Sequence, residues 1–319
     1  MAFAIAHSEA EWAALFGEPS KPTVVTVGNF DGVHLGHQRI LGTIHELARQ
    51  ADCKSAVLTF FPHPARVLRP AEAPPLLMTL DQRLDAIRQL GIDAALVLPF
   101  DMQLAAVAPE DFARRFLVDT LHARTVLVGG DFRFGHQQTG DVRMLAQLGQ
   151  RWNFDVKTLP PVIKDGIVVS STAIRGALRE GRVEDARNLL GRPYTLAGEI
   201  RTGTGQGRKL IVPTLNLSTQ QEMLPKNGVY ATEVTVAGKT YRAATNVGFR
   251  PTFDGAHTTI ESHLFDFDEN LTSGKMEVHF WARLRDEQKF SGPDALRSQV
   301  LKDIDEARRY FAAMPIKGG

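Results

Sequence analysis

The chain changes its hydrophobic pattern near residue 185, and this change constrains the fold more than any other feature of the sequence. Before that point, short apolar runs rich in β-branched residues alternate with segments of helical period. Strands that alternate with helices pair in parallel through crossover helices, so this part predicts a doubly wound α/β sheet. The predicted strands are residues 23–27, 55–60, 94–98, 125–128 and 155–159.

After residue 185 the sequence becomes rich in strands. One short helix is predicted at 183–190, followed by two strands at 228–236 and 240–247 that flank a tight turn. Residues 276–284 alternate apolar and polar side chains, as a strand with one buried face does, and Pro293 begins a final helix that ends near Ala313. This order predicts a small antiparallel β-barrel with a C-terminal helix, and hence two domains, 1–185 and 186–319.

Composition excludes several classes of function. The net charge is +1 and neither half is strongly basic, so we expect no nucleic-acid partner. The single cysteine, Cys53, excludes an intramolecular disulfide and a cysteine-based zinc site. The N-terminus has no basic flank, and no apolar run reaches the ~20 residues of a membrane span. We therefore expect a cytoplasmic protein that does not bind a membrane.

A glycine-rich segment with two histidines follows the first predicted strand directly. Glycines at a strand-to-helix turn let the backbone approach a phosphate, and the helix start favours an anion. His34 and His37 are three residues apart, so they share a face of the first helical turn. Two imidazoles there can donate hydrogen bonds to a triphosphate and stabilise a leaving pyrophosphate, although a pair of surface histidines is the alternative. The predicted phosphate-binding residues of this segment are Gly28, Phe30, Asp31 and Gly36.

Three further segments extend this first site. Aromatic residues follow the second and fourth predicted strands, at the end of the sheet where ligands bind. Hydroxyl groups and Arg175 at a later helix start are suited to a second anion clamp. Taken singly, core packing and helix caps explain these residues equally well. The candidates are Phe60, Phe61 and Pro62, then Asp131, Phe132 and Phe134, then Ser170, Ser171, Thr172 and Arg175.

A second candidate site lies in the strand-rich part. Gly205, Gly207 and Arg208 form a loop that is able to cover phosphates. Thr214 and Asn216 are two residues apart, so on a strand they project to one face and offer two oxygen ligands to Mg²⁺. The alternative is that both side chains hydrogen-bond a turn after Pro213.

These motifs together resemble a known family. The pattern G-x-F-D-G-x-H-x-G-H at 28–37 resembles the signature of the HxGH nucleotidyltransferases. The stretches at 59–64, 131–135 and 170–175 are similar to those in the N-terminal module of bacterial bifunctional riboflavin kinase/FAD synthetases. The P-T-x-N stretch at 213–216 and the run that follows Glu261 are similar to the riboflavin kinase module of the same family. The resemblance spans about residues 23 to 311.

The resemblance implies two activities and their substrates. The N-terminal module would adenylate FMN with ATP to give FAD, and the C-terminal barrel would phosphorylate riboflavin with ATP and Mg²⁺ to give FMN. The aromatic residues would wall the isoalloxazine ring, and Glu261 would act as the base of the kinase. Riboflavin, FMN and FAD would be substrates and products, and no flavin would stay bound as a prosthetic group.

Departures from the family pattern leave alternatives open. Ile211, Val212 and Leu215 stand beside the predicted metal ligands where the family has smaller residues, and Ser273-Gly274 replaces a Tyr-Gly pair. One alternative is an FMN adenylyltransferase whose barrel is a flavin-binding regulatory domain. A second is a redox flavoprotein that uses bound FMN, and a third is a nucleotidyltransferase with another phosphorylated acceptor. Rates, channelling of FMN and the oligomeric state are not predicted.

Overall fold

The computed structural model describes residues 3–17, 21–201, 213–252, 255–269 and 271–314. The chain folds into two compact units, Met1–Ser170 and Ser171–Gly319. Each unit has its own hydrophobic core.

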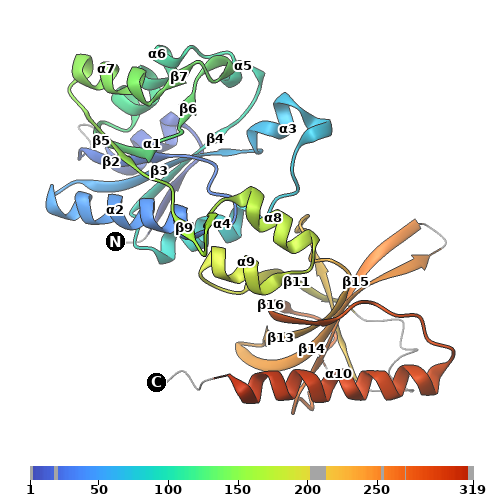
Figure 1. The fold of residues 1–319 in the computed structure, drawn as a ribbon. Coiled ribbons are helices and arrows are strands. Elements are labelled where there is room, and N and C mark those ends of the chain that lie inside the picture. The colour runs from blue at the N-terminus through green and yellow to red at the C-terminus, as the bar shows by residue number, and fades with distance from the viewer. Residues whose placement is uncertain (1–2, 18–20, 202–212, 253–254, 270, 315–319) are drawn as a thin grey trace. The chain divides into compact units, whose positions relative to one another are not determined.

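The first unit is built on a six-stranded sheet in which all neighbouring strands are parallel (Figure 1). This confirms the prediction of a doubly wound α/β sheet, and β2 and β8 have the predicted bounds. The edge strand β1 was not predicted, because three residues are too few to show a period. In spatial order the strands are β1 (Ala4–Ala6), β4 (Ala94–Pro99), β3 (Lys54–Phe61), β2 (Thr23–Val27), β5 (Ala123–Gly129) and β8 (Asp155–Leu159).

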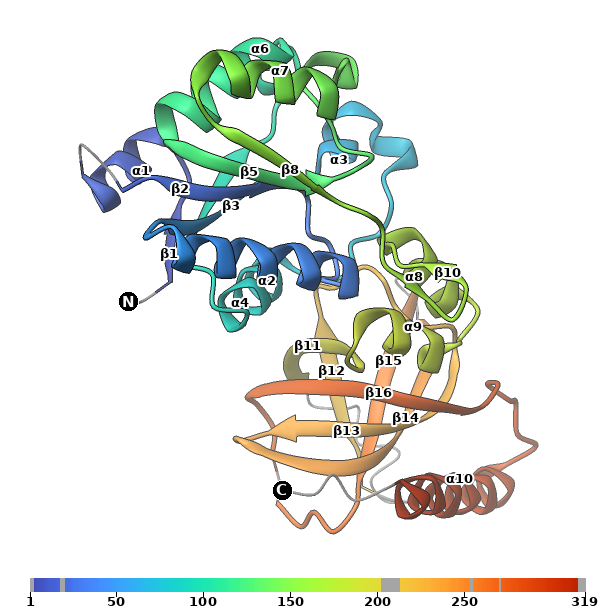
Figure 2. The same ribbon diagram turned by 60° about the vertical axis from the view of Figure 1, so that its left-hand side comes forward.

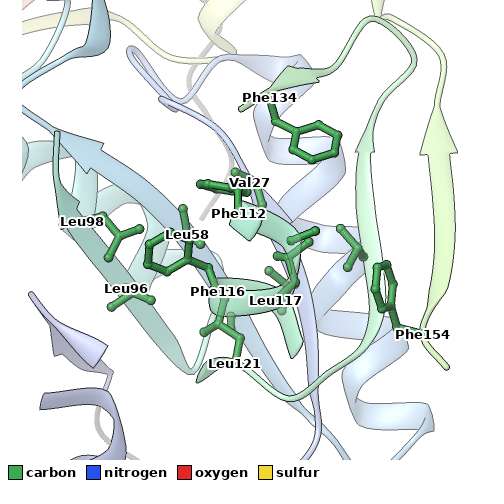
Figure 3. Packing of buried hydrophobic residues seen from close by; sticks show 14 of the residues in the cluster. Val27, Leu58, Leu96, Leu98, Phe112, Phe116, Leu117, Leu121, Phe134 and Phe154 are labelled. Carbon is green, nitrogen blue, oxygen red and sulfur yellow. The ribbon is translucent and has the colours of Figure 1, made fainter. Parts of the chain in front are cut away.

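Helices cover both faces of this sheet (Figure 2). Neighbouring residues of a strand point to opposite faces, so Val25 and Leu58 join one buried cluster while Val24 and Val57 join the other. Figure 3 shows Phe112, Phe116 and Leu117 packed against the strand residues of the first cluster. The helices of this unit are α1 (Glu9–Phe16), α2 (Leu35–Gln50), α3 (Pro64–Leu68), η1 (Pro70–Glu72), α4 (Leu80–Gln89), α5 (Met102–Ala105), α6 (Pro109–Phe112), η2 (Ala113–Thr120), η3 (His136–Gln138) and α7 (Val142–Trp152).

The strand order reverses its direction between β2 and β5. From β2 the chain proceeds through β3 to β4 on one side, whereas β5 and β8 lie on the other side. Ligands of open α/β sheets bind outside the carboxyl ends of the strands at such a switch point. The segments that follow β2, β3 and β5 therefore lie at the edge where a ligand is expected. Two short hairpins complete the unit, β6 (Arg133–Phe134) with β7 (Gly140–Asp141), and β9 (Ile163–Lys164) with β10 (Ile167–Val168).

The second unit is a closed barrel of six antiparallel strands preceded by two helices and followed by one, which confirms the predicted architecture. The long helix α10 (Pro293–Ala313) packs Ile304, Ala307 and Phe311 against Ala231 and Ala244 of the barrel. The other helices are α8 (Ser171–Arg179) and α9 (Val183–Leu190). Around the barrel the strands are β11 (Tyr194–Arg201), β12 (Leu215–Thr219), β15 (Gly255–Leu264), β14 (Lys239–Thr252), β13 (Gly228–Val236) and β16 (Lys275–Arg285).

Helices α8 and α9 fall within the compact unit of the barrel. The domain boundary at residue 185 was predicted from the change of hydrophobic pattern at that point, and it stays a prediction.

Candidate active sites

The glycine-rich segment forms a tight connection between β2 and α2. Phe30 and Val33 are buried and take positive φ angles of 51° and 40°, so the backbone turns sharply while both side chains enter the core. A Cβ at Gly36 would lie 3.1 Å from the ring of His34, and one at Gly28 would lie 3.2 Å from the ring of Phe30. Glycine at these two positions therefore allows the rings to fold back over the start of the helix.

The two histidines lie together at the N-terminus of α2, as predicted from their spacing. His34 is the N-cap, and its Nδ1 accepts the backbone N–H of His37 at 3.3 Å. The two imidazole rings are stacked, with centroids 3.6 Å apart and planes 15° from parallel. Because Nδ1 of His34 accepts a hydrogen bond, the neutral ring carries its proton on Nε2. Both rings are thus ordered N–H donors at a helix start, where an anion is favoured.

His37 is kept uncharged by its surroundings. Its pKa is lowered well below the ordinary value of 6.5, chiefly by burial, and then by the neighbouring His34 and the cation of Arg83. At neutral pH the ring is therefore a neutral hydrogen-bond donor. Its edge also meets the ring of Phe30, with centroids 5.1 Å apart, which orients the imidazole.

Asp31 holds the segment before α4 beside the glycine-rich turn. Its carboxylate is 2% exposed and accepts the backbone N–H groups of Leu77, at 3.0 and 3.2 Å, and of Met78, at 3.3 Å. The observed contacts are structural, and the predicted role of Asp31 in nucleotide binding stays a prediction.

Arg83, which the sequence interpretation did not single out, is fully buried beside this site. It lies on α4, and its Nη1 donates to the hydroxyl of Thr59 at 3.4 Å and to the carbonyl of Phe60 at 3.3 Å. A signal was present, because Arg83 occupies the same helical stripe as Leu80, Leu84 and Ile87. A charged residue in an apolar stripe is the kind of exception that marks a function.

Aromatic side chains gather at the carboxyl ends of β3 and β5. Phe60 packs against Phe112, with ring centroids 6.4 Å apart, and Phe112 packs against Phe134 at 6.0 Å. Phe134 is buried and stacks on the half-buried Phe132 with centroids 5.5 Å apart. Phe134 thus supports Phe132 from within the core, and its direct contact with a flavin stays a prediction.

Phe61 is the most exposed of the aromatic candidates. Phe61 is 45% exposed and Pro62 is half-buried, so this pair offers apolar surface to a ligand. Asp131 is exposed, and its carboxylate lies over the backbone of Gly129, where an added Cβ would come within 2.9 Å.

The residues predicted to bind an anion, Ser170 to Arg175, lie at the end of the β9–β10 hairpin segment and in the first turns of α8. The carbonyl oxygen of Val169 lies 3.8 Å from the position that a Cβ of Gly36 would take, so the chain at Ser170 passes close to the start of α2. Ser171 begins α8, Thr172 is exposed and Arg175 is 6% exposed. The contact of these side chains with a pyrophosphate stays a prediction.

In the barrel, strand pairing aligns three polar residues in one row. Asn216 of β12 is the direct partner of Glu261 of β15, and Glu261 is the direct partner of Asn246 of β14. The residues before and after each of them are buried: Leu215, Leu217, Ile260, Ser262, Thr245 and Val247. Side chains alternate between the two faces of a strand, so the row of Asn216, Glu261 and Asn246 lies on the outer face of the barrel. Sequence reasoning assigned no role to Asn246, because its partners come from strands distant in the chain.

Thr214 lies at the entrance to β12, directly before this row. It is exposed, and the preceding Pro213 presents its carbonyl oxygen 2.9 Å from Nδ1 of His263 on β15. A carbonyl can only accept, so the Nδ1–H of His263 donates this bond. It ties the segment that carries Thr214 to the strand that carries Glu261.

The bulk of Leu215 does not lie beside the proposed metal ligands. Leu215 is 8% exposed and points into the barrel, whereas Asn216 points outward. The other predicted residues of this site, Gly205, Gly207 and Arg208, lie outside the described residues, as do Ile211 and Val212.

Two kinds of feature are absent from the ranges that the structure describes. No group of three or more His, Cys, Asp and Glu side chains in these ranges is arranged to hold a metal ion. None of the helices that the structure describes is long and apolar enough to cross a membrane.

Comparison with known proteins matches each half of the chain to one enzyme. Residues 17–173 match the family model described as FAD synthetase, and residues 190–311 match the model described as riboflavin kinase. Proteins described as bifunctional riboflavin kinase/FMN adenylyltransferase are similar over nearly the whole chain. The one from Pseudomonas fluorescens is 37% identical, covering 91% of this chain and 93% of its own. The one from Haemophilus influenzae is 35% identical, covering 90% and 94%, and the one from Escherichia coli K12 is 34% identical, covering 92% and 94%.

A solved structure shares the fold. The crystal structure described as a macrolide-efflux protein from Streptococcus pneumoniae has a TM-score of 0.85 and 28% sequence identity. It covers 97% of this chain and 99% of its own.

Proposed function

The chain belongs to the bifunctional riboflavin kinase/FMN adenylyltransferase family, and on that premise we propose which residues carry out its two reactions. The resemblance seen in the motifs is confirmed by this membership. The enzyme phosphorylates riboflavin to FMN and adenylates FMN to FAD. We infer that the first reaction takes place on the barrel and the second at the carboxyl edge of the parallel sheet.

In the adenylation, a phosphate oxygen of FMN attacks the α-phosphorus of ATP. The bond from the α-phosphorus to the oxygen that bridges it to the β-phosphorus breaks, and pyrophosphate leaves with that electron pair. His34 and His37 donate N–H groups to the phosphates and stabilise the charge that develops on the leaving group. The segment of Gly28, Phe30, Asp31 and Gly36 shapes the cradle, and Ser170, Ser171, Thr172 and Arg175 bind the pyrophosphate.

The isoalloxazine ring of FMN binds beside the aromatic cluster of the same edge. A flat aromatic ring system needs apolar walls, and the exposed face of Phe61 with the half-buried Phe60 and Phe132 supplies them. Pro62, Asp131 and Phe134 complete this proposed flavin site.

In the kinase reaction, Glu261 is the general base. It takes the proton of the ribityl 5′-hydroxyl as that oxygen attacks the γ-phosphorus, and ADP is the leaving group. Gly205, Gly207 and Arg208 are proposed to cover the phosphates.

Thr214 and Asn216 fit a magnesium ion. Both offer uncharged oxygen donors, which Mg²⁺ accepts alongside water and nucleotide phosphates. Asn216 is the direct partner of Glu261, and the His263 bond to Pro213 holds the segment that carries Thr214 to the same strand. When bound, Mg²⁺ would neutralise charge on the phosphates of ATP.

Since ATP is the shared donor, we propose the cytoplasm as the location of both reactions.

One observation carries this assignment: the candidate catalytic residues form two groups, and each group lies in a different folded unit. The stacked His34 and His37 lie in one folded unit, and the row of Asn216 and Glu261 lies in the other. Each set is suited to one of the two reactions.

Single substitutions are expected to remove one activity at a time. Riboflavin, ATP and Mg²⁺ are incubated with wild type, Glu261→Gln or His34→Ala, and FMN and FAD are separated by chromatography. Glu261→Gln should lower FMN formation by about 10² to 10⁴-fold, the usual contribution of a general base, while supplied FMN is still converted to FAD. His34→Ala should accumulate FMN and lower FAD formation by about 10² to 10³-fold.

Exposed residues of the same types provide matched controls. Glu306→Gln on α10 and His7→Ala should leave both activities unchanged. If either site variant abolished both activities in folded protein, the assignment of the reactions to separate sites would be wrong. A chain that makes no FMN from riboflavin would contradict the assignment of the kinase reaction to the barrel.

A further inference from the structure

Arg83 is a buried cation whose hydrogen-bonding groups are only partly used. Its side chain is 0% exposed, and only Nη1 has partners, in Thr59 and Phe60. Among the described residues, its Nε and Nη2 have no hydrogen-bond partner. Burying a charged group with unmet donors is costly, so a protein keeps one where its charge has a use.

The position of Arg83 indicates that use. Thr59 and Phe60 lie near the carboxyl end of β3, the neighbour of β2, so the guanidinium lies at the sheet edge from which the glycine-rich turn leaves. It interacts electrostatically with His37 on α2 and with Asp31 of the turn. Asp31 in turn holds the backbone of Leu77 and Met78, which lead into α4. One cation thus interacts with His37 of the histidine pair and with Asp31, which holds the segment before α4.

We propose that Arg83 is a positioning residue for adenylyl transfer, a fixed positive charge that favours binding of the triphosphate at the histidine pair. Arg83 acts through the histidines and through its field, and it does not touch the substrate. The proposal rests on adenylyl transfer at His34 and His37, as assigned above. An imidazolium would titrate across the working pH range, whereas a guanidinium keeps its charge throughout.

The charges around His37 agree with this role. The groups that face it are His34 on its own helix and Arg83 on α4, and Asp31 faces Arg83. Burial, His34 and Arg83 all lower the pKa of His37, so removal of the Arg83 cation should raise that pKa towards its ordinary value.

The test compares a variant that loses the positive charge of Arg83 with a variant that loses one hydrogen-bond partner of Arg83 and keeps the charge. Arg83→Met removes the cation at similar length, Arg83→Lys keeps a cation, and Thr59→Val removes one hydrogen-bond partner while the charge stays. Each full-length variant is assayed for kcat and KM of FAD formation from pH 5.5 to 8.5, and the pKa of His37 is measured by NMR on histidine-labelled protein. Kinase activity of the same sample reports the integrity of the other unit.

In wild type, kcat should show no decrease at the acidic end of this pH range that comes from protonation of His37. Arg83→Met should lower kcat by about 10- to 100-fold with little change in the KM for FMN and should raise the pKa of His37, while burial still holds that pKa below its ordinary value. Arg83→Lys and Thr59→Val should keep the low pKa of His37 and most of the rate. Should Arg83→Met not fold, Arg83→Gln removes the charge and retains donors towards Thr59 and Phe60.

Two results would overturn the proposal. One is a folded, uncharged variant in which the pKa of His37 and the pH profile match wild type. The other is equal loss of rate in Arg83→Met and Thr59→Val with no change in that pKa, which would make Arg83 a packing residue only. Either result, together with loss of FAD formation in His34→Ala, would leave the assigned function intact. Full FAD formation by His34→Ala would contradict that function itself.

Discussion

At the scale of the residue, the local surroundings determine what each histidine does. His37 at the start of α2 and His279 in the barrel both have a pKa lowered chiefly by burial. His34 instead serves as an N-cap, which gives its ring one fixed orientation. The same side chain is therefore a neutral donor in one place and a structural cap in another.

The lowered pKa of His37 predicts a pH-dependent stability of the first unit. In the unfolded chain this histidine binds a proton near pH 6.5, whereas in the folded chain it does so only at lower pH. Stability should therefore fall as the pH drops below about 6.5 and level off once the folded protein is protonated too. Denaturant unfolding of the first unit between pH 7.5 and 5 measures this slope.

His37→Gln should make this slope shallower, because the group that gains a proton on unfolding is gone. The pKa of His279 is also lowered, so this residue changes stability with pH in the same direction, but it belongs to the second unit. Unfolding of the first unit therefore has to be followed with probes that lie in it, such as Trp12 and Trp152. An unchanged slope in His37→Gln would show that this ring titrates alike in the folded and unfolded chains.

At the scale of the element, the kinase site depends on how β12 is held to β15. Register places Asn216 opposite Glu261, and the His263 bond to Pro213 continues the connection beyond the end of β12. A one-residue slip of β12 would turn Asn216 into the barrel and bring Leu215 or Leu217 outward. The pairing of β12 with β15, and not the local sequence of either strand, thus decides which side chains lie opposite one another.

Loss of the His263 bond should weaken the kinase alone. His263→Ala removes a hydrogen bond worth about 1 kcal/mol, so kcat/KM for ATP in FMN formation should fall by about 5-fold as Thr214 loses its fixed position. His263→Asn places an N–H near the same point and should restore most of the rate. FAD formation from supplied FMN should not change in either variant, and a kinase unaffected by His263→Ala would remove this residue from the site.

At the scale of the whole molecule, two cores stabilise two units within one chain. In the second unit, Arg285 at the end of β16 forms a bidentate pair with the buried Asp303 of α10, at 2.7 and 2.6 Å. Gln299 donates to the same carboxylate at 2.9 Å. This pair fastens the C-terminal helix to the barrel.

Damage to this pair should affect the kinase more than FAD formation. Asp303→Ala leaves a poorly exposed guanidinium without its carboxylate partner, which typically costs about 3–5 kcal/mol. The kinase should therefore lose activity at a lower temperature than FAD formation, because His34 and His37 lie in the first unit and only the α8 residues of the adenylation site lie in the second. The exposed Asp305→Ala is the matched control. Parallel thermal loss of both activities would show that the units do not unfold independently.

Much of this protein follows from local sequence alone. The bounds of β2, β8 and β13, the capping box of Thr79 and Gln82, and the start of α10 at Pro293 were all predictable. Each depends on a period or a turn contained within a few neighbouring residues. The stacked His34 and His37 belong to the same class, because one helical turn brings them together.

Other features depend on contacts between distant segments. The pairing of β1 with β4, the alignment of Asn246 with Glu261 and the burial of Arg83 beside Thr59 are examples. Periodicity tells which face of an element is buried, but it does not tell which element lies against that face. Sequence therefore determined the elements and the two candidate chemistries, and the tertiary structure decided which distant side chains complete each site.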